Sequence, residues 1–268
     1  MGKFDNLVDY YNKFNEDKRL KARHGIVEYE VTMFFLMEYC RKQNRPLKIL
    51  DLGAGTGAYS IALAREGHEV TAMEYVNHNL GRLKQHAKEE GVEVKAYQGD
   101  AREIALYPKR YPEKFYDVTL IFGPMYHLFQ KEEKELVLRE AMRVTKPSGR
   151  IYVAYVMNEY SILTYGFKEG HLLESMASGK IDKDFHVKNA PEDLYDYVRL
   201  ADIDALNQAV GAKRVDIFSP DGPANLMRPV LKEMDEETFA MFLSYQKKMA
   251  RCPELLGAGG HLVDVVMQ

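Results

Sequence analysis

The residues of this chain best suited to hold a small ligand surround a glycine-rich loop after residue 50. Gly53, Gly55 and Gly57 occupy alternate positions shortly after Asp51. Glycine lets the backbone turn tightly and lets a ligand reach the main chain where a Cβ atom would collide. A short apolar run precedes the loop and a helical pattern follows it, which is the context of a ligand-binding loop. The predicted cofactor contacts here are Asp51, Gly53, Ala54, Gly55, Thr56 and Gly57.

Two classes of ligand compete for this loop. Gly53, Gly55 and Ala58 also satisfy the dinucleotide pattern G-x-G-x-x-A, so an NAD-dependent oxidoreductase is one alternative. A carboxylate at Asp51 would crowd a pyrophosphate, because like charges repel strongly where solvent is scarce. S-adenosylmethionine instead presents an ammonium and a sulfonium, which are complementary to an acidic strand end. The charge therefore favours S-adenosylmethionine.

Two more acids end the next two predicted strands. Glu74 follows Gly57 by 17 positions, close to the spacing at which an acid meets ribose hydroxyls. A carboxylate can accept both hydroxyl protons. Asp100 ends the third predicted strand and is expected to accept from an adenine amino group. Because the carboxyl ends of parallel strands share one edge of the sheet, all three acids should face the same crevice.

The segment after the fourth predicted strand is the expected acceptor side. It reads Phe-Gly-Pro-Met-Tyr-His-Leu over residues 122–128. Tyr126 is predicted to line the substrate pocket, and His127 is the candidate general base because an imidazole titrates near neutrality. The alternative for His127 is a packed residue at the start of a helix.

The order of apolar runs and helical patterns indicates how these residues are positioned. From Leu47 onward, short strands alternate with helices, which predicts parallel crossovers and a doubly wound α/β sheet. The first forty residues are predicted to be helical with a break at Gly25, and Asn79 is a predicted helix N-cap. The predicted strands span residues 47–52, 70–73, 92–96, 116–122, 151–156, 213–218 and 262–267.

Four segments follow from this order. Residues 1–45 are expected to form an N-terminal helical cap, and residues 46–157 the cofactor-binding core. Residues 158–199 are polar and interrupt the alternation, so they are predicted to be a lid or insertion. Residues 200–268 should complete the core sheet and carry an inserted helix.

The residues from Asp51 to Gly57, together with Glu74 and Asp100, resemble the class I S-adenosylmethionine-dependent methyltransferases. The resemblance implies a Rossmann-like, doubly wound sheet of seven strands whose last strand is antiparallel. It implies that the glycine loop holds the methionine part, that Glu74 holds the ribose with Tyr75 against the adenine, and that Asp100 and Ala101 hold the adenine. N-terminal residues such as Tyr11, Arg19 and Arg23 are expected to close over the cofactor; Tyr11 and Arg23 are the predicted contacts.

The resemblance also bears on the acceptor. Gly123-Pro124-Met125-Tyr126 is similar to the Asn/Asp-Pro-Pro-Tyr motif of amino-group methyltransferases acting on nucleic acid and protein. Gly123 replaces the amide or acid that grips the amine, which argues against those substrates; Gly123 is kept as a cofactor contact. No acids follow the fourth strand as in metal-dependent O-methyltransferases, so no metal is expected.

Composition excludes several other classes of protein. The chain has 268 residues, 46% of them apolar, and a net charge of −3 from 37 basic and 40 acidic residues. That composition is typical of a packed globular protein and lacks the basic excess of a nucleic-acid binder. Its two cysteines, Cys40 and Cys252, are too few for a disulfide framework or closed zinc site. With no signal-peptide pattern and no long apolar run, a cytoplasmic protein with no membrane partner is expected.

These observations predict a methyltransferase that moves a methyl group from S-adenosylmethionine, leaving S-adenosylhomocysteine, to an O, N or S nucleophile of a small molecule. The reaction is an in-line displacement, in which positioning supplies much of the rate. The alternatives are an NAD-dependent oxidoreductase on the same fold and a non-catalytic S-adenosylmethionine-binding protein.

Overall fold

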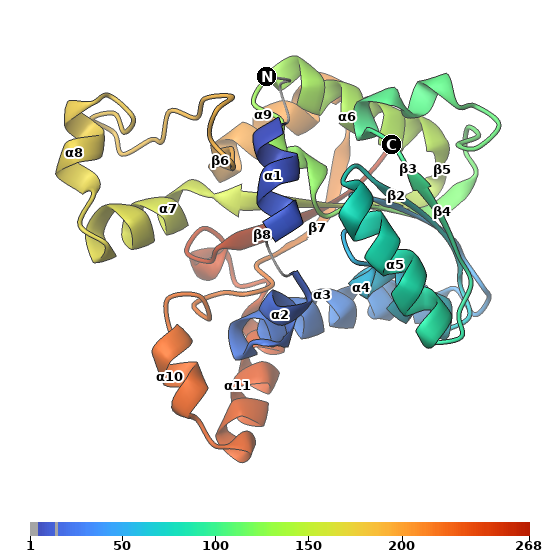
Figure 1. Ribbon diagram of the computed structural model, residues 1–268, viewed down its shortest axis with the longest axis horizontal. Coiled ribbons are helices and arrows are strands. Elements are labelled where there is room, and N and C mark those ends of the chain that lie inside the picture. The colour runs from blue at the N-terminus through green and yellow to red at the C-terminus, as the bar shows by residue number, and fades with distance from the viewer. Residues whose placement is uncertain (1–4, 14–15) are drawn as a thin grey trace.

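The computed structural model describes residues 5–13 and 16–268 (Figure 1). Helices and strands alternate through the core, as the apolar pattern predicts. The helices are α1 (Asp5–Lys13), α2 (Glu16–Lys21), α3 (Arg23–Lys42), α4 (Ala58–Arg65), α5 (Asn77–Glu89), α6 (Lys131–Val144), α7 (Asn158–Ser161), α8 (Leu172–Ala177), α9 (Leu200–Val210), α10 (Arg228–Glu233) and α11 (Glu236–Met249). The strands are β1 (Lys48–Leu52), β2 (Glu69–Glu74), β3 (Val94–Gln98), β4 (Tyr116–Ile121), β5 (Thr145–Met157), β6 (Tyr197–Val198), β7 (Lys213–Phe218) and β8 (His261–Met267). Further helical segments, of 3₁₀ type except for the π-helix η3, are η1 (Ala101–Leu106), η2 (Pro124–His127), η3 (Ile162–Lys168) and η4 (Pro253–Leu255).

The strands form one mixed sheet in the order β3-β2-β1-β4-β5-β8-β7. Strands β1 to β5 pair in parallel, whereas β8 lies antiparallel between β5 and β7. The predicted sheet with an antiparallel last strand is therefore confirmed. The structure adds one strand to the predicted seven, because β6 pairs with the end of β5.

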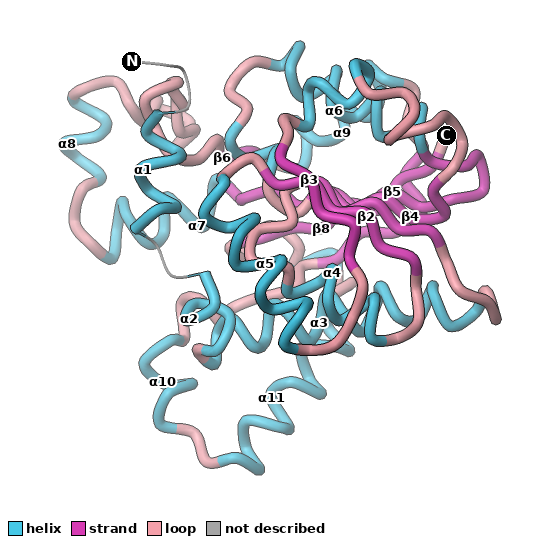
Figure 2. The backbone as a smooth tube through the Cα atoms, turned by 45° about the vertical axis from the view of Figure 1, so that its right-hand side comes forward, coloured by secondary structure: helices cyan, strands magenta, loops and turns pink. Residues whose placement is uncertain are grey.

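Helices cover both faces of this sheet, as alternating apolar residues require. Along β5, Ile151, Val153 and Tyr155 pack with α6 and α9, whereas Tyr152 and Ala154 pack with α3 on the other face. Figure 2 shows α6 and α9 on one side of the sheet and α3 and α4 on the other. Below α3, the helices α10 and α11 extend away from the sheet (Figure 1). This arrangement leaves the carboxyl ends of β1 to β4 available for a ligand.

The N-terminal helices differ from the prediction in where the chain bends. The break lies at Ala22, between α2 and α3, and Gly25 is inside the first turns of α3. A Cβ atom at Gly25 would lie 2.2 Å from the carbonyl oxygen of Arg19, so this glycine lets α2 pack closely on α3. Because α3 packs on the sheet, only α1 and α2 remain as the cap expected for residues 1–45.

The predicted N-cap at Asn79 is also wrong. Helix α5 begins at Asn77, with Val76 as its extended N-cap residue. The helix begins early because the Glu74 carboxylate accepts a hydrogen bond of 2.8 Å from the Val76 amide. Asn79 is instead buried in the first turns of the helix.

Among the helices of the described residues, none combines the length and the apolar character that a membrane crossing requires.

Candidate functional site

The carboxyl ends of the first four strands open into one cavity. The space outside protein atoms in this cavity is about 1310 Å³, including the open mouth. Helices α1 and α2 reach over it with Leu7, Tyr11, Arg19 and Leu20. The predicted site residues that line it are Tyr11, Asp51, Gly53, Ala54, Gly55, Thr56, Glu74, Tyr75, Asp100, Ala101, Gly123, Tyr126 and His127.

The glycine loop is held against β2 by its backbone. The amides of Gly53 and Ala54 donate to the Met73 carbonyl at 2.9 and 3.0 Å. Gly53 has φ +79° and an added Cβ atom would lie 2.6 Å from Cδ of Pro124, so no side chain fits there. At Gly55, with φ +56°, an added Cβ atom would meet nothing within 4 Å. The loop is thus packed against protein at Gly53 and open toward the cavity at Gly55.

Asp51 is buried beneath this loop. Its Oδ2 accepts a hydrogen bond of 2.6 Å from the Ser60 hydroxyl. Burial and, to a smaller extent, the nearby Glu74 raise the pKa of Asp51 to about 7, against the lowering effect of the Ser60 hydroxyl. The described residues provide no hydrogen-bond partner for Oδ1 of Asp51. The site therefore holds a carboxylate that lacks a cation.

Glu74 lies beside Asp51 at the end of β2. Its Oε2 accepts from the Gly55 amide at 2.8 Å, and its Oε1 accepts from the Val76 amide at 2.8 Å. A carboxylate oxygen has two lone pairs and can accept more than one hydrogen bond. The side chain is fixed by the backbone on both sides, as a residue that receives a diol requires.

Asp100 lines the same cavity but is paired within the protein. Its two oxygens accept from the Arg102 guanidinium at 2.6 to 3.1 Å, and Oδ1 also accepts from the Arg102 amide. Arg102 also binds Glu133 at 2.6 Å. The negative charge expected from Asp100 is therefore largely balanced, and the acidic character of the crevice comes from Asp51 and Glu74. Tyr75, half-exposed, stands at the mouth.

Two predicted contacts do not reach the cavity. Gly57 has φ +92° and caps α4, packed against Leu83 instead of the ligand space. The prediction for Arg23 is wrong in this structure, because its guanidinium donates to the carbonyls of Leu231 and Met234 and pairs with Glu236. The bend at Ala22 turns Arg23 toward α10 and α11. Arg19 of α2 lines the cavity in its place.

His127 lies at the cavity wall with both ring nitrogens in use. Nδ1 lies 2.8 Å from the Leu194 carbonyl and must donate to it, so Nε2 accepts from the Tyr11 hydroxyl at 3.1 Å. Burial lowers the pKa of His127 to about 4. The geometry therefore makes this histidine a neutral link between α1 and the insertion, which weighs against the predicted role of general base. Tyr126 lines the cavity and donates its hydroxyl to the Phe122 carbonyl at 2.6 Å.

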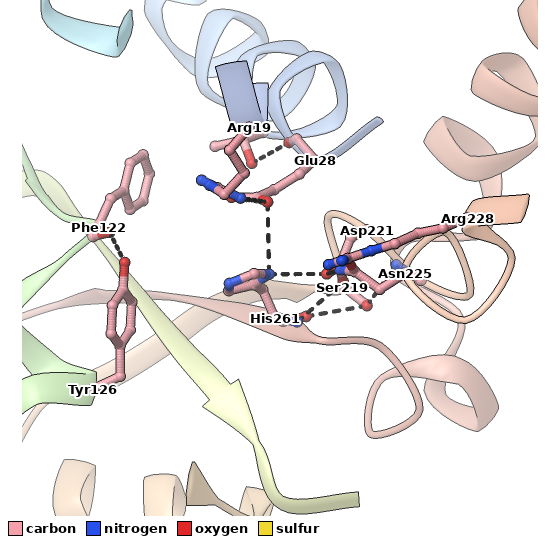
Figure 3. Close-up of polar contacts among 11 residues, drawn as sticks. Arg19, Glu28, Phe122, Tyr126, Ser219, Asp221, Asn225, Arg228 and His261 are labelled. Atoms are coloured by element: carbon pink, nitrogen blue, oxygen red, sulfur yellow. Dashed lines mark hydrogen bonds and ion pairs between the residues drawn. The ribbon is translucent and has the colours of Figure 1, made fainter. Parts of the chain in front are cut away.

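A second cluster of charged residues, which the sequence did not predict, lies at this cavity. Glu28 of α3 and His261 of β8 both line it, and Asp221 lies fully buried behind His261 (Figure 3). No local pattern connects these residues, which lie far apart in the chain. The only sequence signal was the Gly259-Gly260-His261 segment before the last strand. The predicted insertion of residues 158–199 contributes none of the described residues that line the cavity.

This cluster has the spacing of a possible metal site. Ligand atoms of Glu28, Asp221 and His261 lie within 4.8 Å of one another. Protein donors already occupy the carboxylates: Arg19 binds Glu28 at 2.5 Å, and Asn225 donates to Asp221 at 2.7 Å. A cation would have to displace them beside the positive charge of Arg19. The donor set therefore fits a hydrogen-bonded cluster better than a metal centre.

Comparison with known proteins agrees with this geometry. Residues 49–149 match the family model described as a methyltransferase domain. Over 178 residues the chain is 26% identical to a ubiquinone biosynthesis O-methyltransferase of Caulobacter sp. (strain K31), covering 66% of this chain and 63% of that protein. It is 33% identical over 113 residues to a cypemycin N-terminal methyltransferase of Streptomyces sp., covering 41% of this chain and 43% of that protein. The chain thus spans less than two thirds of the length of these two relatives.

A solved structure supports the fold over a larger share of the chain. The magnesium protoporphyrin IX methyltransferase of Synechocystis PCC 6803 superimposes with a TM-score of 0.57 at 16% identity, covering 81% of this chain and 92% of that one. At this identity the likeness concerns the fold. The methyltransferase-domain match over residues 49–149, the strand order and the acidic glycine loop together support a class I S-adenosylmethionine-dependent methyltransferase.

Proposed function

We propose that this protein transfers the methyl group of S-adenosylmethionine to a nucleophilic atom of a small molecule bound in the same cavity. The observation that carries the proposal is the pair of buried acids, Asp51 and Glu74, at the open glycine loop. A cationic nucleoside fits this pair, whereas the pyrophosphate of a dinucleotide would face the uncompensated carboxylate of Asp51.

The residues of the donor site fit the two polar ends of S-adenosylmethionine. Oδ1 of Asp51 lacks a partner among the described residues and would accept from the ammonium. The carboxylate of Glu74 would accept from the ribose hydroxyls, and Tyr75 would flank the adenine at the mouth. Gly55 leaves room for the ligand to touch the main chain. When bound, the cofactor supplies a methyl group on a positively charged sulfur.

The acceptor side is the remaining wall of the cavity. It is formed by aromatic and apolar groups, including Tyr59, Phe122 and Tyr126, beside the charged residues Glu28 and His261. Such a wall excludes water and holds a ring-sized molecule in one orientation, which is the main requirement for in-line displacement. The named relatives act on different acceptor atoms, so they do not select between oxygen and nitrogen.

Two measurements test this proposal. Calorimetric titration should show binding of S-adenosylhomocysteine and no comparable binding of NADH. Incubation with methyl-tritiated S-adenosylmethionine and a library of phenols, amines, carboxylates and thiols should then yield labelled product. NADH binding without S-adenosylhomocysteine binding would support the oxidoreductase. Tight S-adenosylhomocysteine binding with no labelled product from any acceptor would support a non-catalytic binding protein.

A further inference from the structure

His261, at the start of β8, has a geometry that the donor site does not explain. Its Nδ1 lies 2.9 Å from Oδ2 of Asp221 and 3.8 Å from Oε2 of Glu28. No hydrogen-bond partner for Nε2 exists among the described residues. Figure 3 shows one edge of the ring turned toward the two acids and the other toward Phe122 and Tyr126. The ring centroids of His261 and Tyr126 lie 6.5 Å apart.

Asp221 is built into the fold as a fixed acceptor for this ring. It is fully buried, and its carboxylate also accepts from the His261 amide at 3.1 Å and from Asn225 at 2.7 Å. A Cβ atom at Gly260 would lie 2.7 Å from Oδ2 of Asp221, and one at Gly259 would lie 2.8 Å from Oδ1. The two glycines before His261 therefore let β8 pack directly on the acid. A carboxylate so placed keeps the proton on Nδ1 and leaves the lone pair on Nε2.

We infer that His261 is the general base for the acceptor, that Asp221 and Glu28 position it, and that the acceptor carries a weakly acidic hydroxyl group such as a phenol. The inference rests on the proposed methyl transfer and names its substrate class. The O–H bond of the acceptor breaks and its proton moves to Nε2. The oxygen forms a bond to the methyl carbon while the carbon–sulfur bond breaks, and that electron pair stays on sulfur. The proton then passes from His261 to solvent.

A phenolic hydroxyl suits this base because proton transfer is most efficient when the base titrates near the working pH. The charged groups that face His261 are Asp221, Glu28 of α3 and Arg19 of α2, with His24 and Arg228 close to the same cluster. Burial lowers the pKa of His261, but Glu28 and Asp221 outweigh it, so the pKa lies above its usual value. Activity should therefore rise with pH through a pKa above about 6.5.

The test begins with the histidine itself, independently of any acceptor. Nitrogen-15 NMR of labelled histidine should show His261 protonated on Nδ1 in its neutral form, with a pKa above about 6.5. The Asp221→Asn and Glu28→Gln variants should each lower that pKa. A neutral form protonated on Nε2, or a pKa that neither variant moves, overturns the inference even if no acceptor is found.

The second arm measures methyl transfer from labelled S-adenosylmethionine to a panel of monophenols and catechols. His261→Gln should lower kcat by about 100-fold, within the usual range for a lost general base, and bind S-adenosylhomocysteine with wild-type affinity. Asp221→Asn should shift the kcat/KM pH profile as it shifts the NMR pKa. The matched control is His171→Ala, on the insertion outside the cavity. This variant should leave kcat and the kcat/KM pH profile unchanged.

The outcomes separate this inference from the proposed function. If the wild-type protein does not bind S-adenosylhomocysteine, the proposed function is refuted. A His261→Gln variant that binds S-adenosylhomocysteine and methylates phenols at the wild-type rate would refute only the role of His261. Stoichiometric Zn²⁺ or Mg²⁺ binding that is abolished in His261→Gln would refute it in favour of a metal site.

Discussion

At the scale of single residues, the central feature is an acid kept in the wrong environment for its charge. Burial and the nearby acid Glu74 raise the pKa of Asp51 to about 7, against the lowering effect of its one partner, the Ser60 hydroxyl. A bound ammonium would remove that penalty. The arrangement that favours a cation is therefore already formed in the ligand-free protein.

A pH dependence of cofactor affinity follows from this pKa. Below pH 7 Asp51 is increasingly protonated, so a cationic ligand must first compete with a proton, and affinity should fall by up to about tenfold per pH unit. Above pH 8 the affinity should level off until the ligand's own ammonium deprotonates. Calorimetry with S-adenosylhomocysteine from pH 5.5 to 8 measures this directly. An affinity independent of pH over that range would show that Asp51 does not meet the ammonium.

The local residues of the donor site were predictable because they are contiguous in sequence. Asp51 lies near the end of β1, the loop from Gly53 to Thr56 follows directly, and Glu74 stands at the end of the next strand. Arg23 was mispredicted for the opposite reason. The bend lies at Ala22 instead of Gly25, and its position decides which arginine faces the cavity. Alanine is not a residue type that predicts a bend, so no signal for it exists in the sequence.

At the scale of elements, α1 and η2 meet through a side-chain link. The Tyr11 hydroxyl donates to His127, which in turn donates to the Leu194 carbonyl before β6. This chain ties the helix over the cavity to the end of β4 and to the insertion. His127 makes these two hydrogen bonds in its neutral form, because burial lowers the pKa of His127 to about 4.

Removing the hydroxyl should loosen the cover of the cavity. Tyr11→Phe deletes one hydrogen bond, worth about 1 kcal/mol, and should speed release of S-adenosylhomocysteine roughly fivefold. Stopped-flow displacement measures that rate, and thermal unfolding without ligand should show a loss of stability of no more than about 1 kcal/mol. An unaltered release rate would mean that α1 does not control access to the site.

The sequence could not show the second charged cluster, because it is assembled only by the order of strands. Glu28, Asp221 and His261 come from α3, from the segment after β7 and from β8. They meet because β8 inserts antiparallel between β5 and β7. Nothing in the segment Pro220-Asp221-Gly222-Pro223 indicates a partner forty residues later in the chain.

At the scale of the whole molecule, stability and function depend on opposite ends of the sheet. Asp117, in β4 far from the cavity edge, accepts from Arg45 at 2.7 Å, from Lys146 at 2.7 Å and from the Lys48 amide at 2.9 Å. Burial opposes ionisation of Asp117, but these donors outweigh it and hold its pKa well below the usual value. The cluster joins the starts of β1, β4 and β5, and its residues are not among those that line the cavity.

Asp117→Asn should therefore destabilise the fold by about 2 kcal/mol at pH 7 and leave cofactor affinity unchanged. Because the folded-state pKa is lowered, this stabilisation is complete above the unfolded-state pKa of about 4 and is lost as the pH falls further. Urea unfolding at pH 7 and pH 3 measures the difference between variant and wild type. If Asp117→Asn lowers the free energy of unfolding by the same amount at both pH values, the ionised Asp117 carboxylate is not the source of this stabilisation.

Asp51 and Glu74 together are expected to select a cationic nucleoside at this cavity. Calorimetry with S-adenosylhomocysteine at pH 8, on the wild type and on Asp51→Asn and Glu74→Gln, tests it most directly. Each variant should bind at least tenfold more weakly, with Asp117→Asn as the control that retains affinity. Wild-type affinity in both folded variants would contradict the account.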